Sequence, residues 1–74
     1  MKIEVRLFAV FREGRFNRKE MEFPEGSSPD DVLDNLKIAR EHVGILLVNG
    51  RGVADDYQLT SNDVMAVFPS LGGG

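Results

Sequence analysis

Hydrophobic and polar residues alternate along two segments near the start of the chain. In the first segment, residues 2–7, the apolar positions are Ile3, Val5 and Leu7. This period of two predicts a half-buried strand. Alternation returns over residues 19–23, after a loop around residues 12–17, and stops at Pro24. The two segments therefore predict an antiparallel hairpin.

The next segment has the spacing and the start signal of a helix. Ser28 suits the N-cap and Pro29 the first helical position, and two aspartates follow in the first turn, where the helix dipole favours acids. Apolar residues then recur at helical spacing, at Val32, Leu33, Leu36 and Ala39. The pattern predicts one short amphipathic helix that covers a sheet, with Gly44 ending the helical region.

The remaining chain predicts three strands separated by turns. Residues 45–48 form a continuous apolar run, and Asn49-Gly50 behind them is a strong hairpin signal. Residues 51–53 would be a brief returning strand, followed by an irregular segment with Leu59 turned inward. Residues 64–68 form the last strand, which Pro69 stops.

This order of elements predicts an α+β fold. A hairpin, one crossing helix and further strands fit a mixed sheet of four to five strands with one main helix packed on one face. The first and last strands would pair in the middle, which is the β-grasp (ubiquitin-like) arrangement. We expect residues 1–69 to form this domain and residues 70–74 to be a flexible, Gly-rich C-terminal tail.

Composition narrows the classes of function. A chain of 74 residues without cysteine allows one small domain and excludes disulfides, thiolate metal sites and a cysteine nucleophile. No apolar run approaches the ~20 residues that span a bilayer, and the first residues alternate in charge, unlike a signal peptide. We therefore expect a cytoplasmic protein without membrane contact.

Charge is distributed unevenly along the chain. Residues 1–19 hold six bases and two acids, whereas residues 20–74 hold three bases and ten acids. The bases between Arg12 and Lys19 flank a turn, and nucleic-acid binding usually needs a domain-wide basic excess. We therefore expect no nucleic-acid partner, while the acidic remainder could steer the domain toward a basic partner surface.

The sequence offers no conventional catalytic or metal-binding residues. His42 is the only histidine, and the pairs Asp30-Asp31 and Asp55-Asp56 stand where helix starts and turns favour acids. No phosphate-binding glycine motif occurs either. We expect a protein that is not an enzyme, with no catalytic residue, no bound metal and no bound cofactor.

Two phenylalanines fall on the side of the sheet away from the helix. Phe8 continues the polar side of the first strand. In the last strand, Phe68 alternates with Met65 and Val67 and so points to the opposite face of the sheet. Two interpretations stand: an exposed aromatic patch at the sheet centre that docks a partner, or rings covered by loops or by the Arg6 stem.

The end of the chain is its most distinctive feature. Five residues follow Pro69, which reach about 15–18 Å when extended, and the last three are glycines. Such a segment can enter a narrow tunnel and present its terminal carboxylate to a partner's chemistry. An ATP-dependent partner could convert that carboxylate to an acyl-adenylate, and a sulfur nucleophile could then leave a thiocarboxylate. A disordered terminus is the alternative interpretation.

Three stretches together resemble the bacterial sulfur-carrier family that includes MoaD and ThiS. They are residues 5–13 (VRLFAVFRE), residues 47–50 (LVNG) and residues 62–69 (NDVMAVFP), which run into the glycines. The first stretch and the Phe-Pro before the tail are more similar to MoaD, the small subunit of molybdopterin synthase. Two features depart from the MoaD pattern. Ser70 stands where MoaD usually has a second proline, and the region between the helix and the third strand is short for MoaD, so its length is closer to that of ThiS.

The resemblance implies specific roles. Gly74 would be adenylated by a MoeB- or ThiF-like enzyme that uses ATP, and then thiolated, while Leu71, Gly72 and Gly73 enter the partner's active site. A MoaE-like large subunit would dock on the interface residues Phe8, Phe68 and Val53; a thiazole synthase would be the partner in the thiamine branch. The sulfur would serve molybdopterin synthesis, or next thiamine synthesis. A ubiquitin-like modifier joined to proteins through Gly74, and a plain interaction module, remain alternatives.

Overall fold

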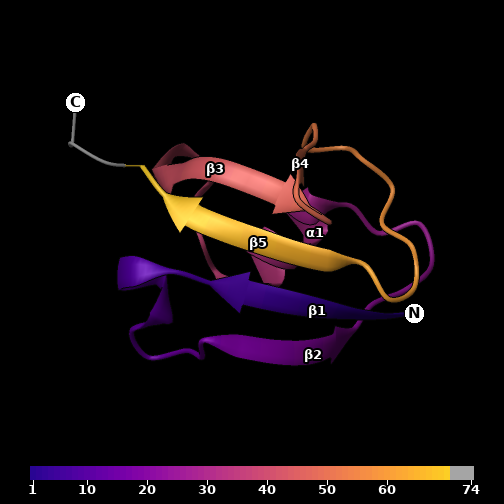
Figure 1. Ribbon diagram of the computed structural model, residues 1–74, viewed down its shortest axis with the longest axis horizontal. Helices are drawn as coiled ribbons and strands as arrows, with labels where there is room; N and C mark the ends of the chain where they lie inside the picture. Colours follow the sequence, from indigo (N-terminus) through magenta and orange to yellow (C-terminus); the bar gives the residue numbers. More distant parts are fainter. Residues whose placement is uncertain (71–74) are drawn as a thin grey trace.

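The computed structural model describes residues 1–70, which form one sheet and one helix (Figure 1). In chain order the elements are β1 (Lys2–Leu7), η1 (Ala9–Arg12), β2 (Arg18–Glu22), α1 (Pro29–Leu36), η2 (Arg40–His42), β3 (Val43–Val48), β4 (Arg51–Gly52) and β5 (Val64–Pro69). The strands lie in the order β2-β1-β5-β3-β4. The predicted fold class and its mixed sheet are confirmed.

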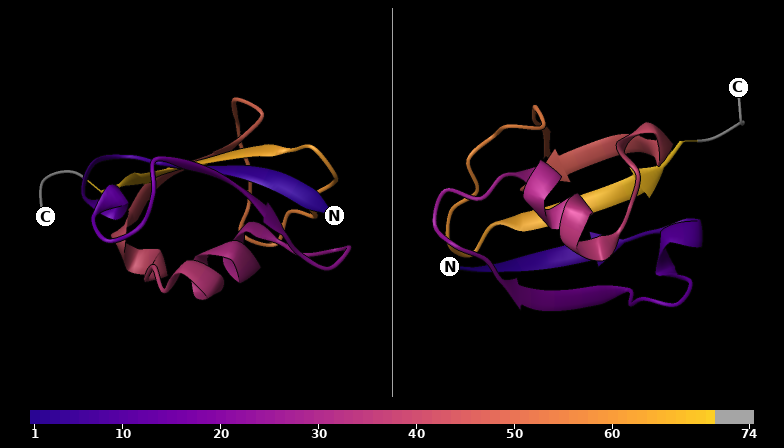
Figure 2. Two further views of the ribbon diagram at one scale, coloured as in Figure 1. Left: turned by 90° about the horizontal axis from the view of Figure 1, so that it is seen from below. Right: turned by 180° about the vertical axis from the view of Figure 1, so that it is seen from behind.

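The first and last long strands pair at the centre of the sheet, as predicted. β1 runs parallel to β5, with Glu4 opposite Val64 and Leu7 opposite Val67. β2 pairs antiparallel with β1, and β3 pairs antiparallel with both β5 and β4. The helix α1 covers one face of the sheet and leaves the other face open (Figure 2).

The core lies between α1 and the covered face. The side chains that it buries almost completely, each below 2% exposure, include Ile3, Val5, Leu7, Val32, Leu33, Met65 and Val67. Alternate residues of β1 and β5 face this core, which confirms the predicted periodicity. Leu59 is also buried, at 2% exposure, as the pattern predicted.

The start of α1 follows the sequence signal closely. The Ser28 hydroxyl accepts from the Asp31 N–H, and the Asp31 carboxylate accepts from the Ser28 N–H at 2.9 Å. This reciprocal capping box satisfies two helix-start donors. Pro29 occupies the first helical position, as predicted.

The end of α1 differs from the prediction. The helix stops at Leu36 because Lys37 adopts the left-handed conformation, with φ of 60°, and Ala39 is an exposed residue outside the helix. The buried position goes instead to Ile38, whose N–H donates to the Leu33 carbonyl at 3.0 Å. Gly44 does not end a helix at all, since it lies inside β3.

The hairpin between β3 and β4 is confirmed, although β4 is shorter than expected. Asn49 and Gly50 both have positive φ, 53° and 82°, as a type I′ turn requires. Val53 lies outside β4 because only Arg51 and Gly52 pair with β3. The single turn η1, which buries Phe11, was not predicted.

No helix among residues 1–70 has the length and apolar character that a membrane crossing would require. The one α-helix, α1, has eight residues.

Candidate functional site

Two aromatic rings stack on the open face of the sheet. The centroids of Phe8, just after β1, and Phe68, in β5, lie 4.1 Å apart, and the ring planes differ by 9°. Phe68 faces away from the core because its neighbour Val67 is fully buried. The parallel pairing of β1 with β5 thus brings together two residues from opposite ends of the chain.

Both rings are half-buried, an arrangement between the exposed and the covered one that the sequence allowed. The guanidinium carbon of Arg12 lies 5.1 Å from the centre of the Phe8 ring, a cation–π distance. The Arg12 Nε also donates to the Leu7 carbonyl at 2.7 Å, which fixes the side chain there. Arg6, whose stem was one of the covers considered, forms an ion pair with Glu4 and lines a hollow together with Phe8.

Beside the stacked rings the surface forms a hollow of about 340 Å³. Ile45 stands opposite Phe68 in the β3–β5 pairing and is 54% exposed, which is high for a large aliphatic residue. We call this surface the docking hollow; its lining residues are Phe8, Ala9, Gly44, Ile45, Phe68, Pro69 and Ser70. An exposed apolar surface of this kind commonly marks a protein contact site.

Basic residues of β1, η1 and β2 lie near the docking hollow. Phe8 also lines a second shallow hollow, together with Arg6, Arg12 and Arg18. Glu4 lies between two of these, since the Arg18 Nε is 4.0 Å from its carboxylate and Arg6 is in direct contact. The apolar part of the open face therefore has a mainly positive edge.

Other bases of the same run have structural roles. The Arg15 Nε donates to the Leu36 carbonyl at 3.1 Å and its Nη1 to the Phe11 carbonyl at 3.2 Å. Arg15 thus satisfies a carbonyl at the end of α1, where helices have no internal donors. This contact supports the interpretation of the basic run as a turn.

The chain leaves β5 at the rim of the docking hollow. The Ser70 N–H donates to the His42 carbonyl at 2.8 Å, and Pro69 is paired with Val43. The sequence predicts that the reactive tail consists of the last four residues, Leu71, Gly72, Gly73 and Gly74. These residues lie outside the part of the chain that the structure describes. The structure therefore places the base of the tail beside the docking hollow.

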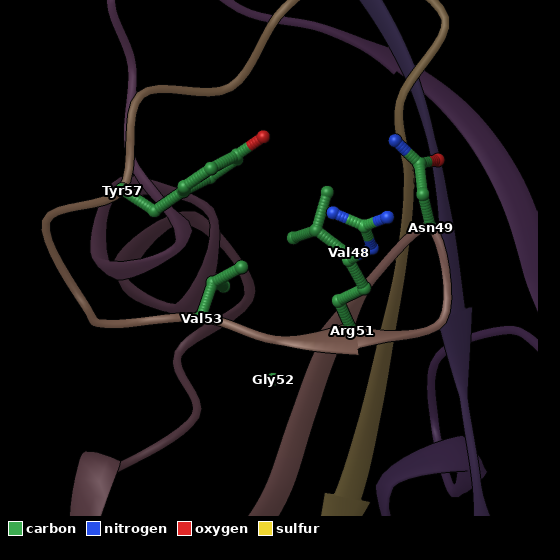
Figure 3. A pocket seen from close by; sticks show the side chains of 6 residues that line it. All are labelled: Val48, Asn49, Arg51, Gly52, Val53 and Tyr57. Carbon is green, nitrogen blue, oxygen red and sulfur yellow. The ribbon is translucent and has the colours of Figure 1, made fainter.

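Val53 does not join the aromatic pair. It lines a different hollow, of about 580 Å³, together with Arg51 and Tyr57 (Figure 3). This hollow also contains Val48, which is paired with Met65 near the start of β5, whereas Phe68 lies near the end of β5. Val53 also packs against the core. The role of Val53 at a partner interface stays a prediction, and any such interface would lie on a surface separate from the docking hollow.

The aspartate pairs serve the fold. Asp31 caps α1, and Asp55 is in contact with the Arg40 guanidinium. Among residues 1–70, no three histidine or acidic side chains gather closely enough to hold a metal ion.

A family model named the ThiS family matches residues 5–74, nearly the whole chain and through its last glycine. The chain belongs to the ThiS family. The resemblance drawn from the three sequence stretches is thereby confirmed. None of the curated proteins compared with the chain matches it.

Solved structures similar to this ThiS-family chain share its fold. A Pyrococcus furiosus protein named as subunit 1 of a molybdopterin converting factor is 32% identical, with a TM-score of 0.80, and the match covers 96% of this chain and 99% of that one. Small archaeal modifier protein 1 of Haloferax volcanii is 22% identical, with a TM-score of 0.78 and coverage of 95% and 98%. Subunit 1 in a Helicobacter pylori molybdopterin-converting factor complex is 21% identical, with a TM-score of 0.65 and full coverage of both chains. At these lower identities the last two show the fold alone.

Proposed function

We propose that this ThiS-family chain is a sulfur carrier whose C-terminal Gly74 becomes a thiocarboxylate that donates sulfur in cofactor biosynthesis. One observation carries the proposal. The family match runs through Gly74, and the three terminal glycines follow a strand that ends at the rim of the docking hollow. A partner seated on that hollow would therefore have the terminal carboxylate within reach.

The proposed chemistry takes place at the chain's own terminus, inside a partner. The Gly74 carboxylate attacks the α-phosphorus of ATP, which releases pyrophosphate and leaves an acyl-adenylate. A sulfide-level nucleophile then attacks the acyl carbon, AMP leaves with the oxygen, and the thiocarboxylate remains. Activation is needed because a carboxylate is a poor electrophile, and glycines offer no side chain that would obstruct the approach.

The partners we propose are an adenylating enzyme of the MoeB or ThiF kind and a sulfur-accepting protein. The stacked rings of Phe8 and Phe68 have the character of an interface anchor, because aromatic residues dominate the energy of protein contacts. The H. pylori neighbour is described as a complex of subunit 1 with subunit 2, so a second subunit on the docking hollow is a reasonable acceptor.

Molybdopterin synthesis is the pathway we favour. The P. furiosus neighbour that carries a molybdopterin name matches 96% of this chain at 32% identity. Thiamine synthesis is the next choice, since the family model is named for ThiS.

The experiment is a mass measurement on the intact protein. The chain is incubated with ATP, a sulfide source and the adenylating enzymes of its own organism, each in turn. We expect a gain equal to the replacement of one oxygen by sulfur, located at Gly74 by fragmentation, and no gain for a chain that ends at Gly73. An unchanged mass with every enzyme would refute the proposal.

A second candidate is a modifier that joins Gly74 to lysines of other proteins. It is favoured by the neighbour named small archaeal modifier protein 1, which shares the fold. Digestion of cell extracts would then release lysines that carry a glycine remnant of this chain. Detection of the thiocarboxylate without such remnants would favour the carrier.

A further inference from the structure

Two main-chain contacts join the base of the tail to the segment where η2 passes into β3. The Ser70 N–H donates to the His42 carbonyl at 2.8 Å. Two residues after His42, Gly44 in β3 lies directly beneath the outgoing chain. A Cβ added at Gly44 would lie 2.8 Å from both the Pro69 carbonyl oxygen and the Ser70 Cα. We call the hydrogen bond and this contact together the Ser70 latch.

The close approach requires glycine at position 44. Cβ atoms essentially never come within 3.0 Å of other heavy atoms, and both neighbours here are backbone, which cannot rotate away as a side chain would. The β3–β5 register also shifts between Val43 and Ile45. This irregularity places Gly44 under the chain, so a side chain there would have to push β5 and β3 apart.

The latch determines where the tail begins. With Ser70 held to His42, four residues follow the anchor, and a chain of that length reaches at most about 14 Å. Without the latch, the last residue held to the sheet is Pro69, which is paired with Val43. One more residue then follows the anchor, which adds about 3.5 Å of reach and removes a restraint on direction. Chemistry at a terminal atom is sensitive to such displacements, because a misplacement of ~1 Å can reduce a rate about a hundredfold.

We propose that Ser70 and Gly44 are positioning residues for the reaction at Gly74. By anchoring the tail beside the docking hollow, they set the distance and direction from which the terminal carboxylate enters the partner's active site. The proposal rests on the proposed carrier function. It implies that an activating enzyme bound to the docking hollow has its reacting centre within about 14 Å of Ser70.

The test uses two matched pairs of full-length variants. Ser70→Pro lacks the N–H donor and Ser70→Ala keeps it, so they differ in the hydrogen bond. Gly44→Ala introduces the clashing Cβ, whereas Gly52→Ala introduces one that meets nothing within 4 Å. Each variant serves as the substrate of the adenylating enzyme in the presence of ATP. Its concentration is varied, and kcat and KM are obtained from the rate of pyrophosphate exchange. Amide hydrogen exchange at residue 70 is measured on the wild type, Ser70→Ala, Gly44→Ala and Gly52→Ala, which retain an N–H there.

We expect Gly52→Ala to stay within twofold of the wild type. Ser70→Ala is the reference for Ser70→Pro, since both lack the hydroxyl at the rim of the docking hollow and only the alanine variant keeps the N–H donor. Ser70→Pro should lower kcat at least fivefold relative to Ser70→Ala, and Gly44→Ala at least fivefold relative to Gly52→Ala, about the value of one main-chain hydrogen bond. The residue 70 amide should exchange several times faster in Gly44→Ala than in Gly52→Ala. Equal kcat for Ser70→Pro and Ser70→Ala, or a change confined to KM, would overturn the positioning role.

Failure of the latch is distinguishable from failure of the carrier function. If the wild type is adenylated and Ser70→Pro reacts equally well, the carrier function stands and the positioning role is wrong. If no enzyme adenylates the wild type, the carrier function is wrong, and the positioning role that rests on it falls too. The exchange measurement then still decides whether the latch forms, since an unprotected Ser70 amide in the wild type would show that it does not.

Discussion

Replacing Asp63 tests how the ends of β3 and β5 are held together. Asp63 is 6% exposed, and both of its carboxylate oxygens are used. One accepts from the Asn49 Nδ2 and the other from the Thr60 N–H, each at 2.8 Å. Asn49 in turn accepts from the Val64 N–H at 2.9 Å through its side-chain oxygen. The carboxylate therefore joins the β3–β4 turn, the turn before β5 and the first residue of β5.

The expected cost follows from these bonds. A hydrogen bond to a charged group contributes about 1.5–3 kcal/mol, so two contribute about 3–6 kcal/mol. Water can reach the exposed Asn49 and Thr60 after the change, which returns part of this energy. We expect Asp63→Ala to lower the free energy of unfolding by about 2–4 kcal/mol, a large share of the ~5–15 kcal/mol typical of a domain.

Urea denaturation followed by circular dichroism measures this change. Thr60→Ala is the matched control, because it keeps the N–H that Asp63 accepts from, and it should stay within about 0.5 kcal/mol of the wild type. Asn49→Ala and the double variant complete a cycle whose coupling should exceed about 1 kcal/mol. A loss below 1 kcal/mol for Asp63→Ala, or additive single changes, would refute this account of the network.

Two further predictions concern the docking hollow and the end of α1. Phe68→Ala should weaken binding to the adenylating enzyme by about thirtyfold or more in titration calorimetry, as loss of an aromatic anchor does. The control Tyr57→Ala, in the separate hollow of Figure 3, should bind within twofold of the wild type. Equal effects of the two substitutions would argue against the docking hollow. Lys37→Gly should raise the free energy of unfolding by about 0.5–1 kcal/mol, because glycine adopts the left-handed conformation of Lys37 without the penalty of a side chain. Thermal denaturation measures this, and a lower melting temperature would contradict it.

The parts of the fold predicted correctly depend on local rules. The alternation in β1 and β5 determined which side chains face the core, and it also placed Phe8 and Phe68 on the open face. The helix start was predictable because Ser28, Pro29 and Asp31 act within one turn. In each case the residues that carry the signal are also those that form the structure.

The parts that were missed depend on distant contacts. α1 ends at Leu36 where Arg15, from the first hairpin, donates to its carbonyl, and the left-handed residue is a lysine where glycine is the usual signal. Gly44 was interpreted as that signal, yet glycine is needed there for the close approach of Pro69 and Ser70. Similarly, Val53 could not be separated from the aromatic pair before the strand order was known.

The central pairing of β1 with β5 has a consequence for synthesis and quality control. β1 leaves the ribosome early, but its central neighbour follows only near the far end of the domain, so the sheet cannot close while most of the chain is being made. The stacked rings form only when this long-range pairing has formed. An enzyme that requires both rings for binding would therefore pass over truncated or unfolded chains, and would spend ATP only on chains that have completed folding.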